Sequence, residues 1–150
     1  KDAVIDALLA REAERFERRL LTAAGAAEGA AAGIEAAFVA GVDFFVTHPV
    51  LTRGRDEESG VLLPRITADG GPLVRRGLDI LAALIEEGVA AGELREVDPR
   101  VTAEVLMRLI LSYFAFPPMH VRVEDPQEAA AFAHALVAGG LRAGVARAAR

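Results

Sequence analysis

The side chains that most often carry out chemistry are few and scattered in this sequence. The three histidines, His48, His120 and His134, lie far apart, and none has a partner at a metal-ligand spacing such as His-x-x-x-His. The acidic groups at 56–58 and 86–87 lie in polar stretches that we expect to be exposed, and no Gly-x-Ser-x-Gly motif is present. The 150 residues include no cysteine, which excludes thiolate nucleophiles and disulfides. We therefore expect no catalytic residues, no metal site and no cofactor, and predict that the protein is not an enzyme.

Several polar residues instead interrupt apolar helical runs. Asp43 stands among Val42, Phe44 and Phe45, and Arg108 interrupts an otherwise apolar run. A charged group inside a helical bundle must be paired or must meet a ligand. Two interpretations stay open: these groups face water at helix edges, or they are the polar anchors of an apolar cavity. The cavity interpretation gives the candidate ligand-binding residues Phe38, Asp43, Phe45, His48, Asp79, Arg108 and Tyr113.

The elements that must position these side chains are all helices, because apolar residues recur at helical spacing throughout. Long helices are expected at 2–23, around Ile34–Phe45 up to His48-Pro49, at 72–92, from Asp98-Pro99 to Pro117, and from Asp125 through Leu141 and Val145. Residues 51–71 are less regular, with a charged loop at 53–60 and a short helix at 61–66 that Pro64 interrupts. We predict one all-α domain, a helical bundle of five long helices plus one or two short ones.

Local signals mark the ends of these helices. Pro72 suits a first helical position, Asp98 is expected as an N-cap, and Asp125 with Glu128 predicts a capping box. Charged residues at 11–19, Glu12 among them, are expected on a solvated face of the first helix.

Charge and hydropathy exclude two classes of partner. The formal net charge is −5 and the chain has no Lys/Arg block, so it cannot by itself supply the electrostatics of nucleic-acid binding. The mean hydropathy is +0.30, but the longest stretches without a charged residue have only thirteen residues, 109–121 and 129–141. A membrane-spanning helix needs about 20. We expect no membrane segment, no export signal and a cytoplasmic location.

The last helix carries small residues on nearly every side and a Gly139-Gly140 pair, which costs about 1 kcal/mol per glycine relative to alanine. Such a cost is reasonable where another helix approaches closely. Together with the apolar helix at 101–116, this predicts homodimerisation, although the two faces could also pack only within the chain. The candidate interface residues are Leu109, Phe132, Leu136, Gly140 and Leu141.

The order and spacing of four segments resemble the C-terminal ligand-binding and dimerisation domain of TetR-family transcriptional regulators. The segments are Lys1–Leu9, Ile85–Arg95, Val97–Val101 and the Ala- and Gly-rich final helix. The resemblance implies that Lys1, at the start of the linking helix, contacts a DNA phosphate. It also implies that operator DNA is otherwise bound only through an N-terminal helix-turn-helix domain absent from this chain.

The resemblance further implies a repressor whose small apolar or amphipathic effector alters DNA binding. Helices from Asp2, Glu28, Pro72 and Asp98 would enclose the effector pocket, and the first would move like a pendulum. The last two long helices would form a four-helix dimer interface. The alternatives are a helical-bundle enzyme or small-molecule carrier, and a purely structural dimerisation module.

Overall fold

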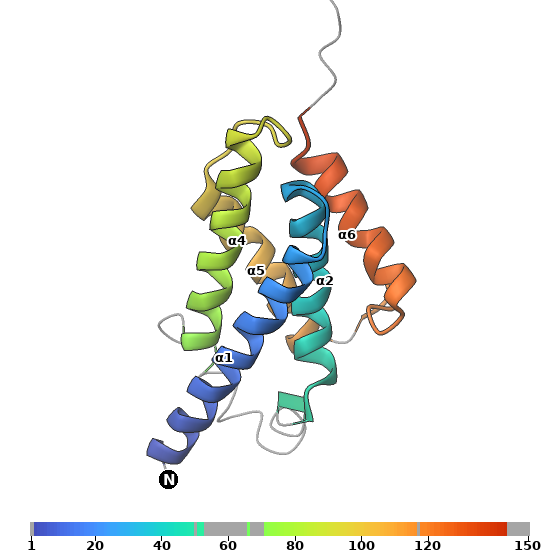
Figure 1. Ribbon diagram of the computed structural model, residues 1–150. Helices are drawn as coiled ribbons and strands as arrows, with labels where there is room; N and C mark the ends of the chain where they lie inside the picture. Colours follow the sequence, from blue (N-terminus) through green and yellow to red (C-terminus); the bar gives the residue numbers. More distant parts are fainter. Residues whose placement is uncertain (1, 50, 53–65, 67–70, 117, 144–150) are drawn as a thin grey trace, which may run out of the picture.

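Five helices make up the bundle, as seen in the computed structural model, which describes residues 2–49, 51–52, 66, 71–116 and 118–143. They are α1 (Asp2–Gly25), α2 (Ala30–Thr47), α4 (Pro72–Ala90), α5 (Pro99–Ala115) and α6 (Pro126–Gly140). The predicted all-α helical bundle is confirmed, and within the described ranges only an isolated bridge, between Leu94 and Arg142, has β geometry. Helix α2 contacts all four other helices, and α6 packs chiefly against α2, on the right in Figure 1.

The core is built from aromatic rings of α1, α2 and α5. The ring of Phe16 lies 5.1 Å from that of Phe44 and 5.4 Å from that of Phe45. Phe45 lies 5.5 Å from Phe114 of α5, and all four side chains are buried. Such offset and edge-to-face pairs stabilise a core beyond the apolar area they bury. These rings occupy space between the helices that were expected to enclose a pocket.

The solvated face predicted for α1 is wrong at one residue. Glu12 is 1% exposed, whereas its neighbours Arg11 and Glu14 are exposed. Glu12 lies one turn before Phe16 and therefore points to the same buried side of α1. Its carboxylate is tolerated there because Arg15 and His48 contact its two oxygens.

The predicted helix starts at Pro72, Pro99 and Pro126 are confirmed, and Asp98 accepts a hydrogen bond from the backbone N–H of Val101. Asp125 caps α6 by accepting from the N–H groups of Gln127 and Glu128. The reciprocal half of the expected capping box is absent from this described turn. Glu128 instead accepts from the backbone N–H of Arg122 at 2.9 Å.

Helix α2 begins at Ala30, before the first apolar marker residue, Ile34, and two residues after Glu28, the start that the resemblance implies. Its N-terminus is capped from elsewhere in the chain. The Glu93 carboxylate, in the connection between α4 and α5, accepts from the backbone N–H of Ala31 at 3.0 Å. Gly29 makes room for that side chain with a φ of +87°, a conformation that favours glycine. The last helix, α6, ends at Gly140, with Leu141 as its C-cap. Val145, which was expected in this helix, lies outside the described residues.

Helix α2 is by length and composition apolar enough to cross a membrane, although Glu35 and Asp43 divide it into short charge-free stretches. A core helix passes the same test. Since α2 contacts every other described helix, its apolar character is accounted for by packing within the bundle.

Candidate functional site

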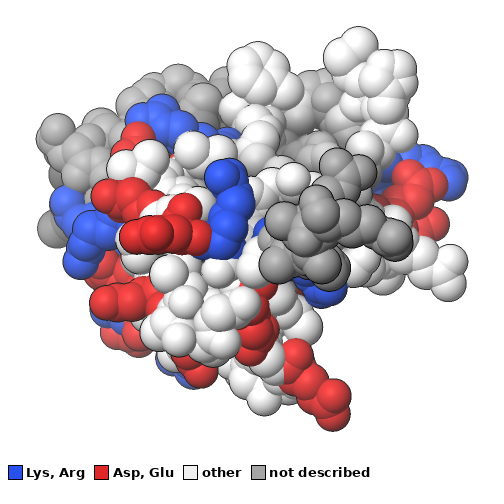
Figure 2. Space-filling model, turned by 90° about the horizontal axis from the view of Figure 1, so that it is seen from above, with Lys and Arg blue, Asp and Glu red and all other residues white. Residues whose placement is uncertain are grey.

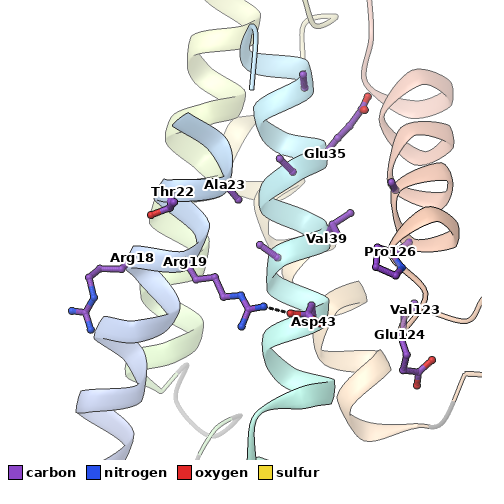
Figure 3. Close-up of a pocket in the computed structure, with 15 residues that line it drawn as sticks. Arg18, Arg19, Thr22, Ala23, Glu35, Val39, Asp43, Val123, Glu124 and Pro126 are labelled. Atoms are coloured by element: carbon purple, nitrogen blue, oxygen red, sulfur yellow. Dashed lines mark hydrogen bonds and ion pairs between the residues drawn. The ribbon is translucent and has the colours of Figure 1, made fainter. Parts of the chain in front are cut away.

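An open groove of about 920 Å³ runs along α2 between α1 and α6 (Figure 3). Its volume lies in the range of small-molecule sites. Helix α2 forms the floor, with Ala32, Ala36, Val39 and Ala40 on one face at helical spacing. Helix α1 and the start of α6 form the two walls. The groove is therefore apolar along its middle and bounded by helices that come from distant parts of the chain.

The floor carries two carboxylates, Glu35 and Asp43, which are the only charged residues of α2. They lie eight positions apart, which corresponds to about 12 Å along a helix. The side chain of Asp43 forms an ion pair with Arg19 of α1, and Figure 3 shows Arg19 pointing across to it. Arg18 points away from the floor in the same view.

The Glu35 side chain is only 18% exposed, which makes it more buried than those of Asp43 and Arg19. Its carboxylate lies 3.2 Å from Nδ1 of His134 and 3.2 Å from a guanidinium nitrogen of Arg142. These contacts join α2 to α6 and to the segment that follows it. Glu35 therefore ties the floor of the groove to the C-terminal end of the described chain.

A second polar cluster lies beneath the aromatic core. The Nε2 of His48 is 3.0 Å from one Glu12 oxygen, and Arg15 donates to the other oxygen at 2.9 Å. The Nδ1 of His48 is buried without a hydrogen-bond partner, and the ring lies 4.8 Å from that of Phe44. Burial lowers the pKa of His48, and the Glu12 carboxylate opposes this effect only in part.

The seven ligand-binding candidates do not come together in one site. Only Asp43 lines the groove. Asp79 and Arg108 are exposed and contact Arg100 and Glu104 respectively, so both face water at helix surfaces. The other four have different surroundings: Phe38 and Phe45 are buried in the core, His48 contacts Glu12, and Tyr113 packs on Phe132 at 6.0 Å, where burial raises its pKa.

The sequence reasoning missed Arg19 and Glu35 as groove residues. The charge pattern places Arg19 on the solvated face of the first helix and indicates no role for Glu35. A signal for both carboxylates was nevertheless present, since Glu35 and Asp43 are the only charges in an eighteen-residue apolar helix and share one face. The Arg19 contact had no such signal because it depends on how α1 crosses α2.

Helices α5 and α6 present a different surface. Large apolar side chains of α5 and the segment after it are exposed: Val101, Val105, Phe116 and Met119, from 53% to 87%. Among the interface candidates, Leu109, Phe132, Leu136 and Gly140 are half-buried, while Leu141 is buried within the chain. A methyl group added at Gly139 or Gly140 would meet nothing within 4 Å, so packing among the described residues does not require glycine there.

Other features of the described residues are less informative. On the face that Figure 2 shows, Lys and Arg are interspersed with Asp and Glu rather than gathered in a basic patch. No group of three or more potential metal ligands occurs among the described residues. Lys1, the expected DNA-contact residue, and the segments 53–60 and 61–65 lie outside them.

The comparisons with known proteins identify one family. Residues 25–138 match the family model for the C-terminal domain of the bacterial tetracycline repressor. This match spans the described helices from the last residue of α1 to α6. The searches of curated proteins and of solved structures give no match.

Proposed function

Because the chain belongs to the family of bacterial tetracycline repressor C-terminal domains, we propose that it is the effector-binding and dimerisation domain of a transcriptional repressor. The effector is a small amphipathic molecule, and operator DNA is contacted by another part of the regulator. The repressor acts in the cytoplasm. The chain performs no catalysis and uses no cofactor.

The groove along α2 is the observation that carries the effector assignment. It has an apolar floor, ionic groups toward both ends and a volume suited to a small organic molecule. It also touches α1, the helix that the family resemblance connects to DNA binding. An effector seated between α1 and α6 would therefore alter how α1 lies against α2. The difference between its affinities for the two positions of α1 sets how far DNA binding changes.

The surface of α5 and α6 supports dimerisation. Its exposed apolar side chains are unusual for a surface that faces only water. Gly139 and Gly140 weaken α6 without any packing reason within the described chain, which favours the close approach of a partner helix. In a two-fold dimer the same helices of both copies would pack together as a four-helix interface.

A thermal-shift screen of amphipathic compounds tests the effector site, since a ligand that binds only the folded state raises the unfolding temperature. We expect Ala36→Trp, which fills the groove floor, to abolish the shift. Ala90→Trp, on an exposed residue outside the groove, is the matched control and should preserve it. A ligand that shifts both variants equally would show that it binds elsewhere.

A further inference from the structure

We propose that the groove selects an organic cation with an apolar body, and that its cationic group takes the place of Arg19 beside Asp43. This inference rests on the proposed function, because it names the class of effector for that same groove. The ligand body would lie along the alanine floor toward Glu35.

The charges of the groove favour a cation. At one end the groove presents Asp43 on its floor and Glu124 on the α6 side, whereas Glu35 on the floor is already paired with His134 and Arg142. Of the two arginines, Arg18 points away from the floor and Arg19 is already paired with Asp43 (Figure 3). At the Asp43 end an anionic ligand would have to approach two carboxylates and would compete with Asp43 for Arg19.

The Arg19–Asp43 pair is also the one that a ligand can replace. Its side chains are 46% and 35% exposed, and ion pairs exposed to this extent contribute little net stability. Asp43 is short and fixed to the helix floor, whereas Arg19 reaches it on a long flexible side chain that can turn to water at low cost. A ligand with an ammonium group and an apolar chain can make the ion pair with Asp43 and also pack its chain on the apolar floor, whereas Arg19 makes only the ion pair.

The replacement has a consequence for α1. The ion pair joins α1 to α2 on the groove side, while Glu17 of α1 pairs with Arg76 of α4 on another side. When the cation occupies Asp43, α1 loses its groove-side ionic contact and keeps the contact to α4. Effector binding would in this way bias the position of α1 without disturbing the aromatic core.

The experiment compares three probes with the same eight-carbon chain, octylamine, octanoate and octanol, by isothermal titration against the 150-residue chain. We expect octylamine to bind most tightly. Asp43→Asn should weaken octylamine by about three-fold, and Arg19→Gln should tighten it by a similar factor, the range that an exposed ion pair supports. Asp79→Asn and Arg11→Gln make the same charge changes at exposed residues outside the groove and should have little effect.

The outcomes separate this inference from the proposed function. Tighter binding of octanoate, or weaker octylamine binding in Arg19→Gln, would overturn the cation assignment but leave an effector groove. If Asp43→Asn and Asp79→Asn changed the octylamine affinity equally, the cation would bind away from Asp43, and this result would also overturn the cation assignment. If none of the three probes binds, both the ligand class and the groove as effector site are contradicted.

Discussion

The Nε2 of His48 lies 3.0 Å from a carboxylate oxygen of Glu12, and this contact joins the end of α2 to the middle of α1 beneath the aromatic core. Glu12 is the only charged residue among the buried residues that the structure describes. A buried carboxylate is costly to leave without its hydrogen-bond donor because it has already lost its hydration. The contact therefore fixes the relation between α1 and α2 at the C-terminal end of α2, beyond Asp43.

Removing both partners of this contact should cost less than the sum of the two single removals. We expect His48→Leu to destabilise the fold by about 1–3 kcal/mol, because it removes a hydrogen-bond donor from a buried carboxylate. Glu12→Leu should also destabilise, since it leaves the Nε2–H of His48 without an acceptor. The double variant should lose less than the sum of the two, with a coupling of about 1–2 kcal/mol in urea unfolding. Strict additivity would contradict the pairing.

The same histidine should make stability depend on pH. Burial lowers the pKa of His48 below its ordinary value of 6.5, so the unfolded chain binds more protons than the folded chain below that pH. Stability from this source is complete above pH 6.5 and declines as the pH falls below it toward the folded-state pKa. His48→Gln should flatten the dependence of the unfolding midpoint between pH 7.5 and 5.5. His120→Gln, at an exposed position, is the control and should leave the dependence unchanged.

Two glycines should respond in opposite directions to alanine. A methyl group at Gly77 would lie 2.8 Å from Sδ of Met107 and 2.9 Å from Cε1 of Phe16, both in the core. Gly77→Ala should therefore destabilise by about 1–3 kcal/mol. Gly139 has open space around it within the described chain, so Gly139→Ala should stabilise the helix of a dissociated chain by up to about 1 kcal/mol. Chemical unfolding at low protein concentration measures both, and equal effects would contradict the packing.

The cap that Glu93 provides for α2 is testable by hydrogen exchange. Glu93→Ala removes the acceptor for the Ala31 N–H and should cost about 1 kcal/mol, with faster exchange at that amide. Glu96→Ala changes a nearby exposed carboxylate and should preserve protection at Ala31. Unchanged exchange in Glu93→Ala would show that the N-terminus of α2 is capped in another way.

The sequence predicts those features whose interacting residues lie close together along the chain. The starts of α5 and α6 follow from Asp98 and Asp125, whose side chains cap groups within three residues. The start of α2 and the burial of Glu12 could not be predicted in this way, because their partners, Glu93 and His48, come from distant parts of the chain.

The groove shows the same division. The face of α2 that forms its floor follows from helical spacing alone. The ion pair between Arg19 and Asp43 depends on where α1 crosses α2, and the second wall depends on the packing of α6 against α2. Local pattern therefore predicts the helices and the face of α2 that forms the floor, whereas the walls and the ion pair depend on the tertiary arrangement.

The central claim, that this chain is a dimerising effector domain, is tested most directly by its mass in solution. Light scattering coupled to size-exclusion chromatography at micromolar concentration should give twice the 15.8 kDa mass of one chain. Gly140→Leu, whose Cβ would meet nothing within 4 Å among the described residues, should block close helix approach on α6 and reduce the mass toward a single chain. A wild-type mass of one chain at these concentrations would contradict the account.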